Sequence, residues 1–317
     1  MKKIHGILGL CAASALALTA RADGEARIQP VRQGTAHEAL FSVAFHNDIG
    51  IAVGAAGAIY ESDDAGKTWK MAQPPTELAL LGLTVQKGCT LAVGQLGVIL
   101  ALTDDGKWVK EESGTDNRLF AVSANSNGLA VAVGGFGTIL SSSDYGHTWK
   151  AVAPDWNTYN DQGEQPHLYD AHVDESGTIT VIGEFGLILR SSDAGATWKA
   201  VHKGDASLFA MELRPDGSGY AVGQDGAALR TADGGETWSD VATDSKAILL
   251  GVHSTADGHV LITAMHDMLY SRDQGHTWSH IGGEAISTSW YQGIANTPDG
   301  APLLAVGAAG QIIRVLD

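Results

Sequence analysis

Histidines and acidic side chains are the groups in this 317-residue chain that could hold a metal or move a proton, and there are 12 and 36 of them. Metal ligands usually occur at short, regular spacings. His276 and His280 lie four residues apart, but the first falls in a turn motif and the second in the strand expected after it. His37 and Glu38 lack the second histidine of a metalloprotease motif. We therefore predict no metal, no cofactor and no catalytic residue.

Three arginines recur at one position of an internal repeat, at Arg190, Arg230 and Arg314, where the other units carry Glu61, Ala101, Ser141 and Tyr270. The arginines form either a basic cluster or separate ion pairs, each with its own acidic turn. Ion pairs of this kind contribute little to stability at a surface. Both interpretations remain open at this point.

The segment from Pro154 to Asp170 is the longest departure from the repeat, and it mixes aromatic with polar side chains. Such a mixture suits recognition of a partner protein or a sugar. The alternative is a decorated loop whose Trp156 packs on its own repeat unit, since loop insertions are tolerated at small entropic cost. For the first hypothesis we expect exposed aromatics beside two apolar turn tips, with these partner-binding candidates: Phe136, Trp156, Tyr159, Asp161, His167 and Phe185.

The elements that must position these residues come from a seven-fold internal repeat. Each unit contains an apolar run with a glycine turn, as in VGGFGTIL from Val133 to Leu140. Short strands repeating about every 40 residues indicate the blades of a β-propeller. The leading residues of the turns show this period, with one longer step: Gly54, Gly94, Gly134, Gly183, Gly223, Thr263 and Gly307.

A second motif, S/T-x-D-x-G-x-T-W, follows five of these turns, and a shortened form runs from Thr103 to Trp108. Its aspartate can accept backbone N–H bonds, its glycine allows a positive φ, and its hydroxyls tie the ends of the turn. Its tryptophan suits a wedge between neighbouring blades. We call these segments the aspartate turns, and their expected structural residues are Asp64 and Trp69, Asp144 and Trp149, Asp193 and Trp198, Asp233 and Trp238, and Asp273 and Trp278.

The repeat predicts an all-β fold: a seven-bladed β-propeller of four-stranded blades over residues 23–317. The last unit ends after its third strand, and Ala26 to Gln33 forms a spare strand at the other end of the chain. Pairing of the two ends closes the ring and removes two open sheet edges. Glycine turns and inter-blade crossings should share one face, opposite the aspartate turns. The inner strands should start at a column of large side chains: Phe41, Leu81, Phe120, Tyr169, Phe209, Leu250 and Tyr291.

Residues 1–22 have the pattern of a secretory signal peptide, with two lysines, an apolar stretch from Ile7 to Leu18 and an Ala-x-Ala site ending at Ala22. The mature chain is then periplasmic or secreted, and Cys89 is its one cysteine. The formal net charge of −16 argues against nucleic acid as a partner, because phosphate binding needs a basic face. No other stretch is apolar for long enough to insert in a membrane.

The aspartate turns resemble the Asp-box, or bacterial neuraminidase, repeat. That resemblance suggests an alternative function as a hydrolase or lyase acting on an extracellular glycan. Glycosidases need two converging carboxylates, and sialidases as a family use three arginines with a tyrosine, its glutamate partner and an aspartate. The sequence assembles neither set, so sialidase activity is not expected.

The chain repeats a compact unit, V-G-x-x-G-x-I-L followed by S-x-D-x-G-x-T-W, after the predicted signal peptide. From Ala26 to Asp317 this repeat resembles the photosystem II assembly and stability factor family. The resemblance implies an exported, non-enzymatic propeller. Its partner would be a protein client, a subunit of a membrane complex whose assembly or stability the propeller assists. The arginine-rich patch of that family would map here onto the three recurring arginines.

Overall fold

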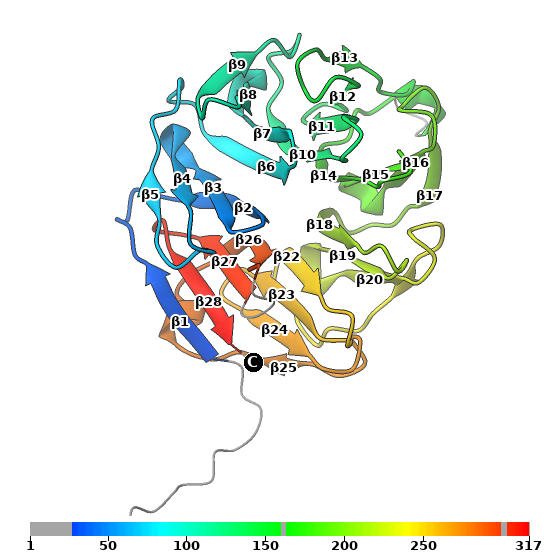
Figure 1. Ribbon diagram of the computed structural model, residues 1–317. Coiled ribbons are helices and arrows are strands. Elements are labelled where there is room, and N and C mark those ends of the chain that lie inside the picture. The colour runs from blue at the N-terminus through cyan, green and yellow to red at the C-terminus, as the bar shows by residue number, and fades with distance from the viewer. Residues whose placement is uncertain (1–26, 160–162, 299–302, 317) are drawn as a thin grey trace, which may run out of the picture.

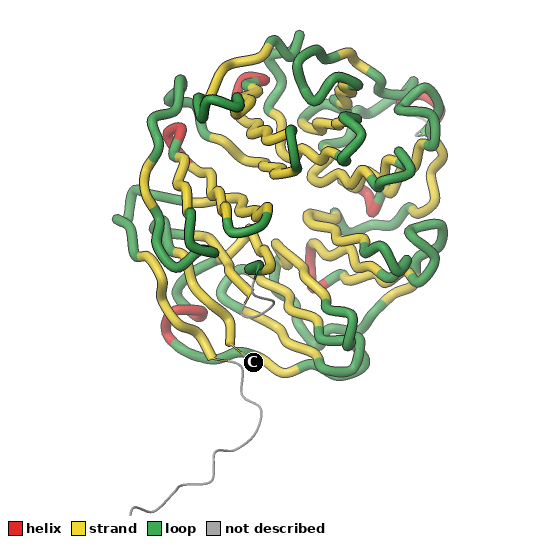
Figure 2. The backbone as a smooth tube through the Cα atoms, viewed as in Figure 1, coloured by secondary structure: helices red, strands yellow, loops and turns green. Residues whose placement is uncertain are grey.

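The computed structural model describes residues 27–159, 163–298 and 303–316, which form seven four-stranded sheets arranged in a ring around a central axis (Figure 1). The predicted seven-bladed, all-β fold is confirmed. Loops and turns connect the strands within each sheet and cross from one sheet to the next (Figure 2). In this part of the chain, no helix has the length and apolar character needed to cross a bilayer.

Each blade is an antiparallel sheet whose innermost strand comes first. Blades 1 to 3 comprise β2 (Leu40–His46), β3 (Ile49–Gly54), β4 (Ile59–Ser62), β5 (Lys70–Met71); β6 (Leu80–Gln86), β7 (Cys89–Gly94), β8 (Ile99–Leu102), β9 (Trp108–Glu111); β10 (Leu119–Ala124), β11 (Ala130–Gly134), β12 (Ile139–Ser142) and β13 (Lys150–Ala151). Blades 4 to 6 comprise β14 (Leu168–Val173), β15 (Ile179–Gly183), β16 (Ile188–Ser191), β17 (Lys199–His202); β18 (Leu208–Leu213), β19 (Gly219–Gly223), β20 (Ala228–Thr231), β21 (Ser239–Asp240); β22 (Leu249–Ser254), β23 (Val260–Ala264), β24 (Met268–Ser271) and β25 (Ser279–His280).

Blade 7 joins the two ends of the chain, as predicted. It contains β26 (Tyr291–Asn296), β27 (Leu303–Gly307), β28 (Ile312–Leu316) and, as its outer strand, β1 (Arg27–Arg32). Figure 1 shows the blue β1 beside the red β28, and Arg27 pairs with Leu316 at one end of the ladder. At the other end, the Arg32 guanidinium donates to Gly310 O, to Glu38 at 2.5 Å and to the Tyr60 hydroxyl at 2.6 Å. Closure therefore links blade 7 to blade 1.

The five full-length aspartate turns share one hydrogen-bond pattern, which Asp193 illustrates. Its Oδ1 accepts from the Thr197 N–H at 2.8 Å, and its Oδ2 accepts from the Thr197 hydroxyl at 2.6 Å. The Ser191 hydroxyl donates to Asp193 at 2.7 Å and accepts from the Gly195 N–H at 2.9 Å. These bonds favour the ionised carboxyl and lower its pKa to about 2. The pKa is lowered to the same level in Asp64, Asp144, Asp233 and Asp273.

The tryptophans of the five full-length aspartate turns pack half-buried against clusters shared with the preceding blade, whereas Trp108 of the shortened turn is buried. Trp198 of blade 4 contacts the core between blades 3 and 4, and its indole N–H donates to Val152 O of the preceding blade at 2.8 Å. Trp69, Trp149, Trp238 and Trp278 occupy the corresponding places. The inter-blade position matches the prediction, although these side chains are only partly covered.

The inner strands share a register shift near their first residues, where two residues oppose one on the second strand. The shifted residues line the end of the central channel nearest the glycine turns: Phe41, Leu81, Phe120, Tyr169, Phe209, Leu250 and Gln292. The inner strands of blades 1 to 6 begin one residue before the predicted column, whereas β26 of blade 7 begins at Tyr291 as predicted, so Tyr291 is out of register with the other members of the column. There Tyr291 pairs with Gly307 and is buried, and Gln292 faces the channel.

Candidate partner-binding face

The glycine turns present one tip residue each, with a positive φ, on the face where the blades are connected. These tips are Ala56, Leu96, Phe136, Phe185, Asp225, His266 and Ala309. In three consecutive blades the tip is large, apolar and exposed: Leu96 is 64% exposed, Phe136 62% and Phe185 50%. We call these three residues the apolar tips.

The apolar tips combine two unfavourable features. A left-handed backbone is uncommon for large side chains, and the φ values of Leu96, Phe136 and Phe185 are 51°, 52° and 60°. Their side chains also stay in water and gain little from packing. The other blades adopt the same turn with alanine, aspartate or histidine, so the fold does not require large apolar residues here. The arrangement therefore indicates a contact surface.

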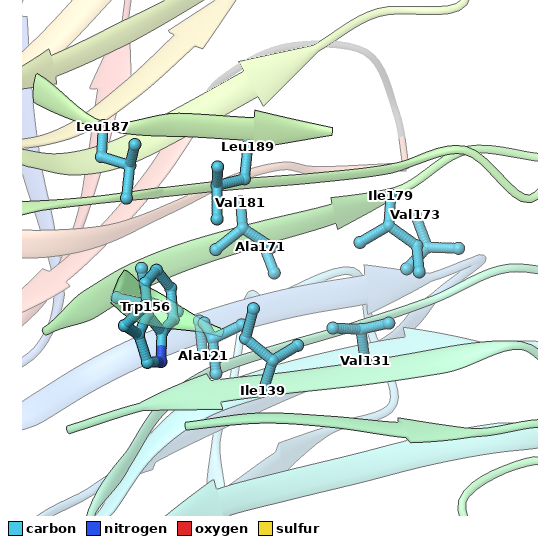
Figure 3. Close-up of a cluster of buried hydrophobic side chains, with 12 residues drawn as sticks. Ala121, Val131, Ile139, Trp156, Ala171, Val173, Ile179, Val181, Leu187 and Leu189 are labelled. Carbon is cyan, nitrogen blue, oxygen red and sulfur yellow. The ribbon is translucent and has the colours of Figure 1, made fainter. Parts of the chain in front are cut away.

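The insertion is anchored by Trp156, contrary to the expectation that this side chain would be exposed. Trp156 begins a short 3-10 helix, η3 (Trp156–Thr158), and is only 6% exposed. It occupies one end of the aliphatic core between blades 3 and 4, close to Ala121 and Ile139 (Figure 3). A side chain at Gly137 would collide with the indole, so the absence of one makes room for it. Trp156 is thus a core residue, and it drops out of the contact surface.

Tyr159 is half-buried beside Trp156, with ring centroids 5.9 Å apart. Its hydroxyl donates to Trp198 O at 2.8 Å, and the Lys203 ammonium donates to Tyr159 O at 2.6 Å. Phe185 borders the hollow of about 230 Å³ between this part of the insertion and blade 4. Tyr159 thus forms one wall of a depression next to an apolar tip.

His167 joins the end of the insertion to the tip of blade 3. Its backbone N–H donates to Glu184 at 2.8 Å, and its Nδ1 accepts from the Phe136 N–H at 3.2 Å. The Phe136 ring meets the imidazole edge to face at 5.2 Å. An open pocket of about 500 Å³ lies beside this contact, and Leu96, Arg118, Phe120, Phe136 and His167 line part of it.

The structure thus brings Phe136, His167, Tyr159 and Phe185 to one face, and Asp161 lies outside the described residues. Leu96 is not among the binding residues predicted from the sequence, although it shares their face. The signal was present in the sequence, since Leu96 aligns with Phe136 and Phe185 in the glycine-turn motif.

Two of the three recurring arginines, Arg190 and Arg230, contact the following blade, which corrects the interpretation that they pair with their own turns. Arg190 of blade 4 donates to Gly234 O and pairs with Glu236 at 3.0 Å, both in the aspartate turn of blade 5. Arg230 of blade 5 donates to the Gln274 side chain of blade 6 at 2.5 Å. These contacts assign Arg190 and Arg230 to blade interfaces; Arg314 is half-buried in β28.

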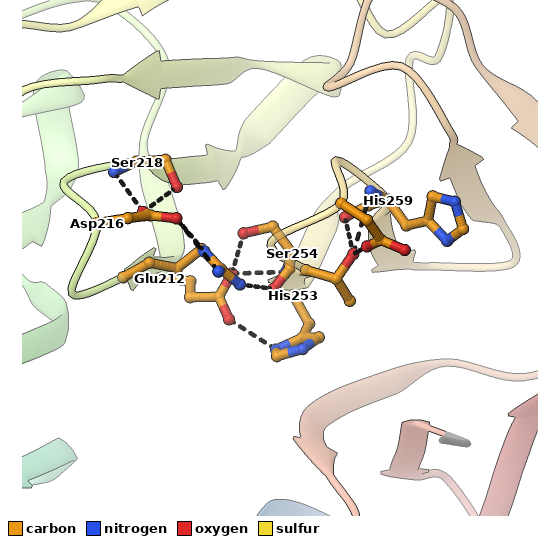
Figure 4. Close-up of polar contacts among 9 residues, drawn as sticks. Glu212, Asp216, Ser218, His253, Ser254 and His259 are labelled. Atoms are coloured by element: carbon orange, nitrogen blue, oxygen red, sulfur yellow. Dashed lines mark hydrogen bonds and ion pairs between the residues drawn. The ribbon is translucent and has the colours of Figure 1, made fainter. Parts of the chain in front are cut away.

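The channel differs between its two ends. At the end nearest the glycine turns, the tip end, aromatic and aliphatic side chains lie beside Ser42, Gln292 and several glycines, with Asp170 as a half-buried carboxylate. Deeper in the channel, Glu212 accepts from the backbone and hydroxyl of Ser254, both at 2.6 Å, and contacts His253 Nδ1 at 2.6 Å (Figure 4). Glu212 is therefore occupied by contacts with blade 6. Among the described residues, no group of three or more histidine, cysteine or acidic side chains is arranged to hold a metal ion.

The fold and this face define a class: a seven-bladed propeller with three exposed apolar residues at consecutive glycine turns. A family model described as Sortilin-Vps10 (sortilin, neurotensin receptor 3) matches residues 186–305, less than half of the chain. No curated protein matches the sequence.

Among solved structures, the chain is similar to "YCF48 bound to D1 peptide", with 18% identity, a TM-score of 0.71 and coverage of 93% of this chain and 97% of that one. It is similar to YCF48 from Cyanidioschyzon merolae, with 19% identity, a TM-score of 0.73 and coverage of 91% and 98%. A streptogramin B lyase gives 13% identity, a TM-score of 0.77 and coverage of 92% and 98%. At such identities the similarities establish the fold alone.

Proposed function

We propose that this protein is an exported, non-enzymatic propeller that binds a protein client through its apolar tips and helps to assemble or stabilise a membrane complex. The observation that carries the proposal is the run of Leu96, Phe136 and Phe185, which are large, exposed and left-handed in three consecutive blades. Aromatic side chains of this kind are favoured as binding hot spots.

Two further observations support the proposal. A YCF48 structure of the same fold is described as bound to a D1 peptide, so this architecture can bind a protein segment. The leader at residues 1–22 has the pattern of a signal for export, which would place the mature chain in the periplasm or outside the cell. A photosystem II assembly factor-like role, with a membrane-complex subunit as client, is the specific form of the proposal.

The alternative, a glycan hydrolase or lyase, has some support from the streptogramin B lyase fold. A glycosidase needs two carboxyl groups that face one another across the scissile bond. At the tip end of the channel the described residues supply one carboxylate, Asp170. A single carboxylate at this end of the channel favours a binding protein over a glycosidase.

The test is capture of the client from a membrane extract by tagged protein, with the double variant Phe136→Ser, Phe185→Ser. Truncation of one hot-spot aromatic costs about 2 kcal/mol or more, which is roughly thirtyfold in affinity. We expect the variant to fold normally and to lose partners that the unmodified protein retains.

Tyr145→Ser provides a matched control, because Tyr145 is also aromatic, 41% exposed and left-handed, with φ 63°, but lies in an aspartate turn on the opposite face. A client that depends on the tips should survive this substitution. Equal recovery by all three proteins would contradict the proposed face.

A further inference from the structure

The tip end of the central channel is surrounded by aromatic rings from neighbouring blades. The rings of Phe120 and Tyr169 lie 5.4 Å apart, and those of Tyr169 and Phe209 lie 4.9 Å apart. Phe41, Leu81 and Leu250 continue this lining around the channel. The cavity has a volume of about 160 Å³. It is smaller than the roughly 300–1,000 Å³ of sites for whole small molecules, so its size suits one side chain.

Among the described residues of this lining, Asp170 is the one acidic side chain. The matching residues of the other blades are uncharged: Ser42, Gly82, Ala121, Ala210, Gly251 and Gly293. The Asp170 carboxylate accepts the N–H groups of Ala171 and Met211, each at 2.8 Å. No described lysine, arginine or histidine forms an ion pair with it. Burial without a cation raises its pKa to about 7, although the two N–H groups act in the opposite direction.

Among the described residues, neither of two histidines further along the inner strands, His253 and His172, is a free cation for Asp170. His253 is held by Glu212 at 2.6 Å. Burial lowers the pKa of His172, which favours its neutral form. Asp170 is therefore a carboxylate in a narrow, partly aromatic space, and a positively charged group from outside would compensate it.

We propose that the tip end of the channel receives the lysine side chain of a protein segment lying across the apolar tips. The four-carbon stem would lie against Phe120, Tyr169 and Phe209, and the ammonium would pair with Asp170. Cations are attracted to aromatic faces, and long stems bury well on apolar surface. The net charge of −16 favours a cationic partner. This inference rests on the proposed protein-binding function and specifies its partner.

Asp170 also has a structural role that the test must separate, because it bridges β14 to the Met211 N–H of β18. Asp170→Asn keeps the size of the side chain and one carbonyl oxygen for that N–H, but removes the charge. If Asp170 served only this bridge, the substitution would leave ligand binding unchanged.

The probe is a blocked pentapeptide with lysine at its centre and alanine elsewhere, titrated into full-length mature protein and followed by NMR chemical shifts. Two matched peptides carry norleucine, which has no charge, and Nε-acetyl-lysine, which keeps a stem of similar length. We expect the lysine peptide to shift channel resonances and the other two to bind at least about tenfold more weakly. Asp170→Asn should weaken the lysine peptide by about tenfold and leave the norleucine peptide unaffected.

Phe209→Leu is a second variant, which keeps an apolar wall and the carboxylate but removes one aromatic face. It should weaken the lysine peptide several-fold and remain informative if Asp170→Asn does not fold. Equal binding of the lysine and norleucine peptides, or no binding of the lysine peptide at millimolar concentration, would overturn the channel site. Either result is compatible with client capture through Phe136 and Phe185. Failure of the proposed function would instead show as equal recovery of the client by the Phe136→Ser, Phe185→Ser variant and the unmodified protein.

Discussion

Substitution of Trp156 by alanine tests whether the insertion is anchored in the core. Trp156 is 6% exposed and belongs to a cluster that includes Ala121, Ile139 and Leu187. Removal of a buried tryptophan costs about 3–5 kcal/mol, because apolar contacts are lost and a cavity remains. Gly137 stands against the indole and has no side chain to fill that space. We therefore expect the full cost to appear in the free energy of unfolding.

The assay is thermal and urea unfolding of the mature protein, followed by tryptophan fluorescence and circular dichroism. For a domain of this size, 1 kcal/mol corresponds to about 2 °C in the melting temperature, so Trp156→Ala should lower it by roughly 6–10 °C. Phe136→Ala is the control, since an exposed side chain should change stability by about 0.5 kcal/mol or less. A Trp156→Ala protein that melts within about 1 °C of the unmodified one would refute the burial argument.

Four other predictions follow from the same contacts. Deletion of residues 26–33 removes β1 and leaves β28 as an open edge, so the protein should aggregate or unfold at much lower temperature in light-scattering and melting experiments. Trp198→Ala should cost about 2–4 kcal/mol in urea unfolding, because its half-buried indole bridges two blades, and an unchanged midpoint would contradict that role. The pKa of Asp193 falls from 3.8 to about 2 on folding, so its contribution to the free energy of unfolding is present above about pH 4 and is lost as the pH drops towards 2. Asp193→Asn should therefore make stability less dependent on pH in this range, and the same pH dependence in both proteins would contradict this. The pKa of Asp170 rises from 3.8 to about 7 on folding, so the free energy of unfolding falls as the pH rises between these values. The stability of Asp170→Asn relative to the unmodified protein should therefore be higher at pH 8 than at pH 5 in urea unfolding, and the reverse order would contradict the burial of an uncompensated charge.

The sequence by itself determined the ring. Turn formation depends on a few adjacent residues, such as the hydroxyl, aspartate and glycine of an aspartate turn, so each unit encodes its own turn locally. The glycine turns recur seven times at a nearly constant spacing, and this number fixes the number of blades. The missing last strand and the spare strand from Ala26 to Gln33 then determined how the ring closes, as the pairing of Arg27 with Leu316 confirms.

Only the tertiary structure decided which side chains of the tip face are available for contact. Trp156 is covered because Gly137, on a different strand pair, leaves room for it, and no local pattern reveals that vacancy. Arg190 contacts Glu236 of the next blade, a neighbour set by the rotation from blade to blade. Asp170 faces a channel formed by seven strands from separate parts of the chain. Local hydrogen bonds are encoded within a few residues, whereas burial and partner choice depend on packing between segments that are distant in the sequence.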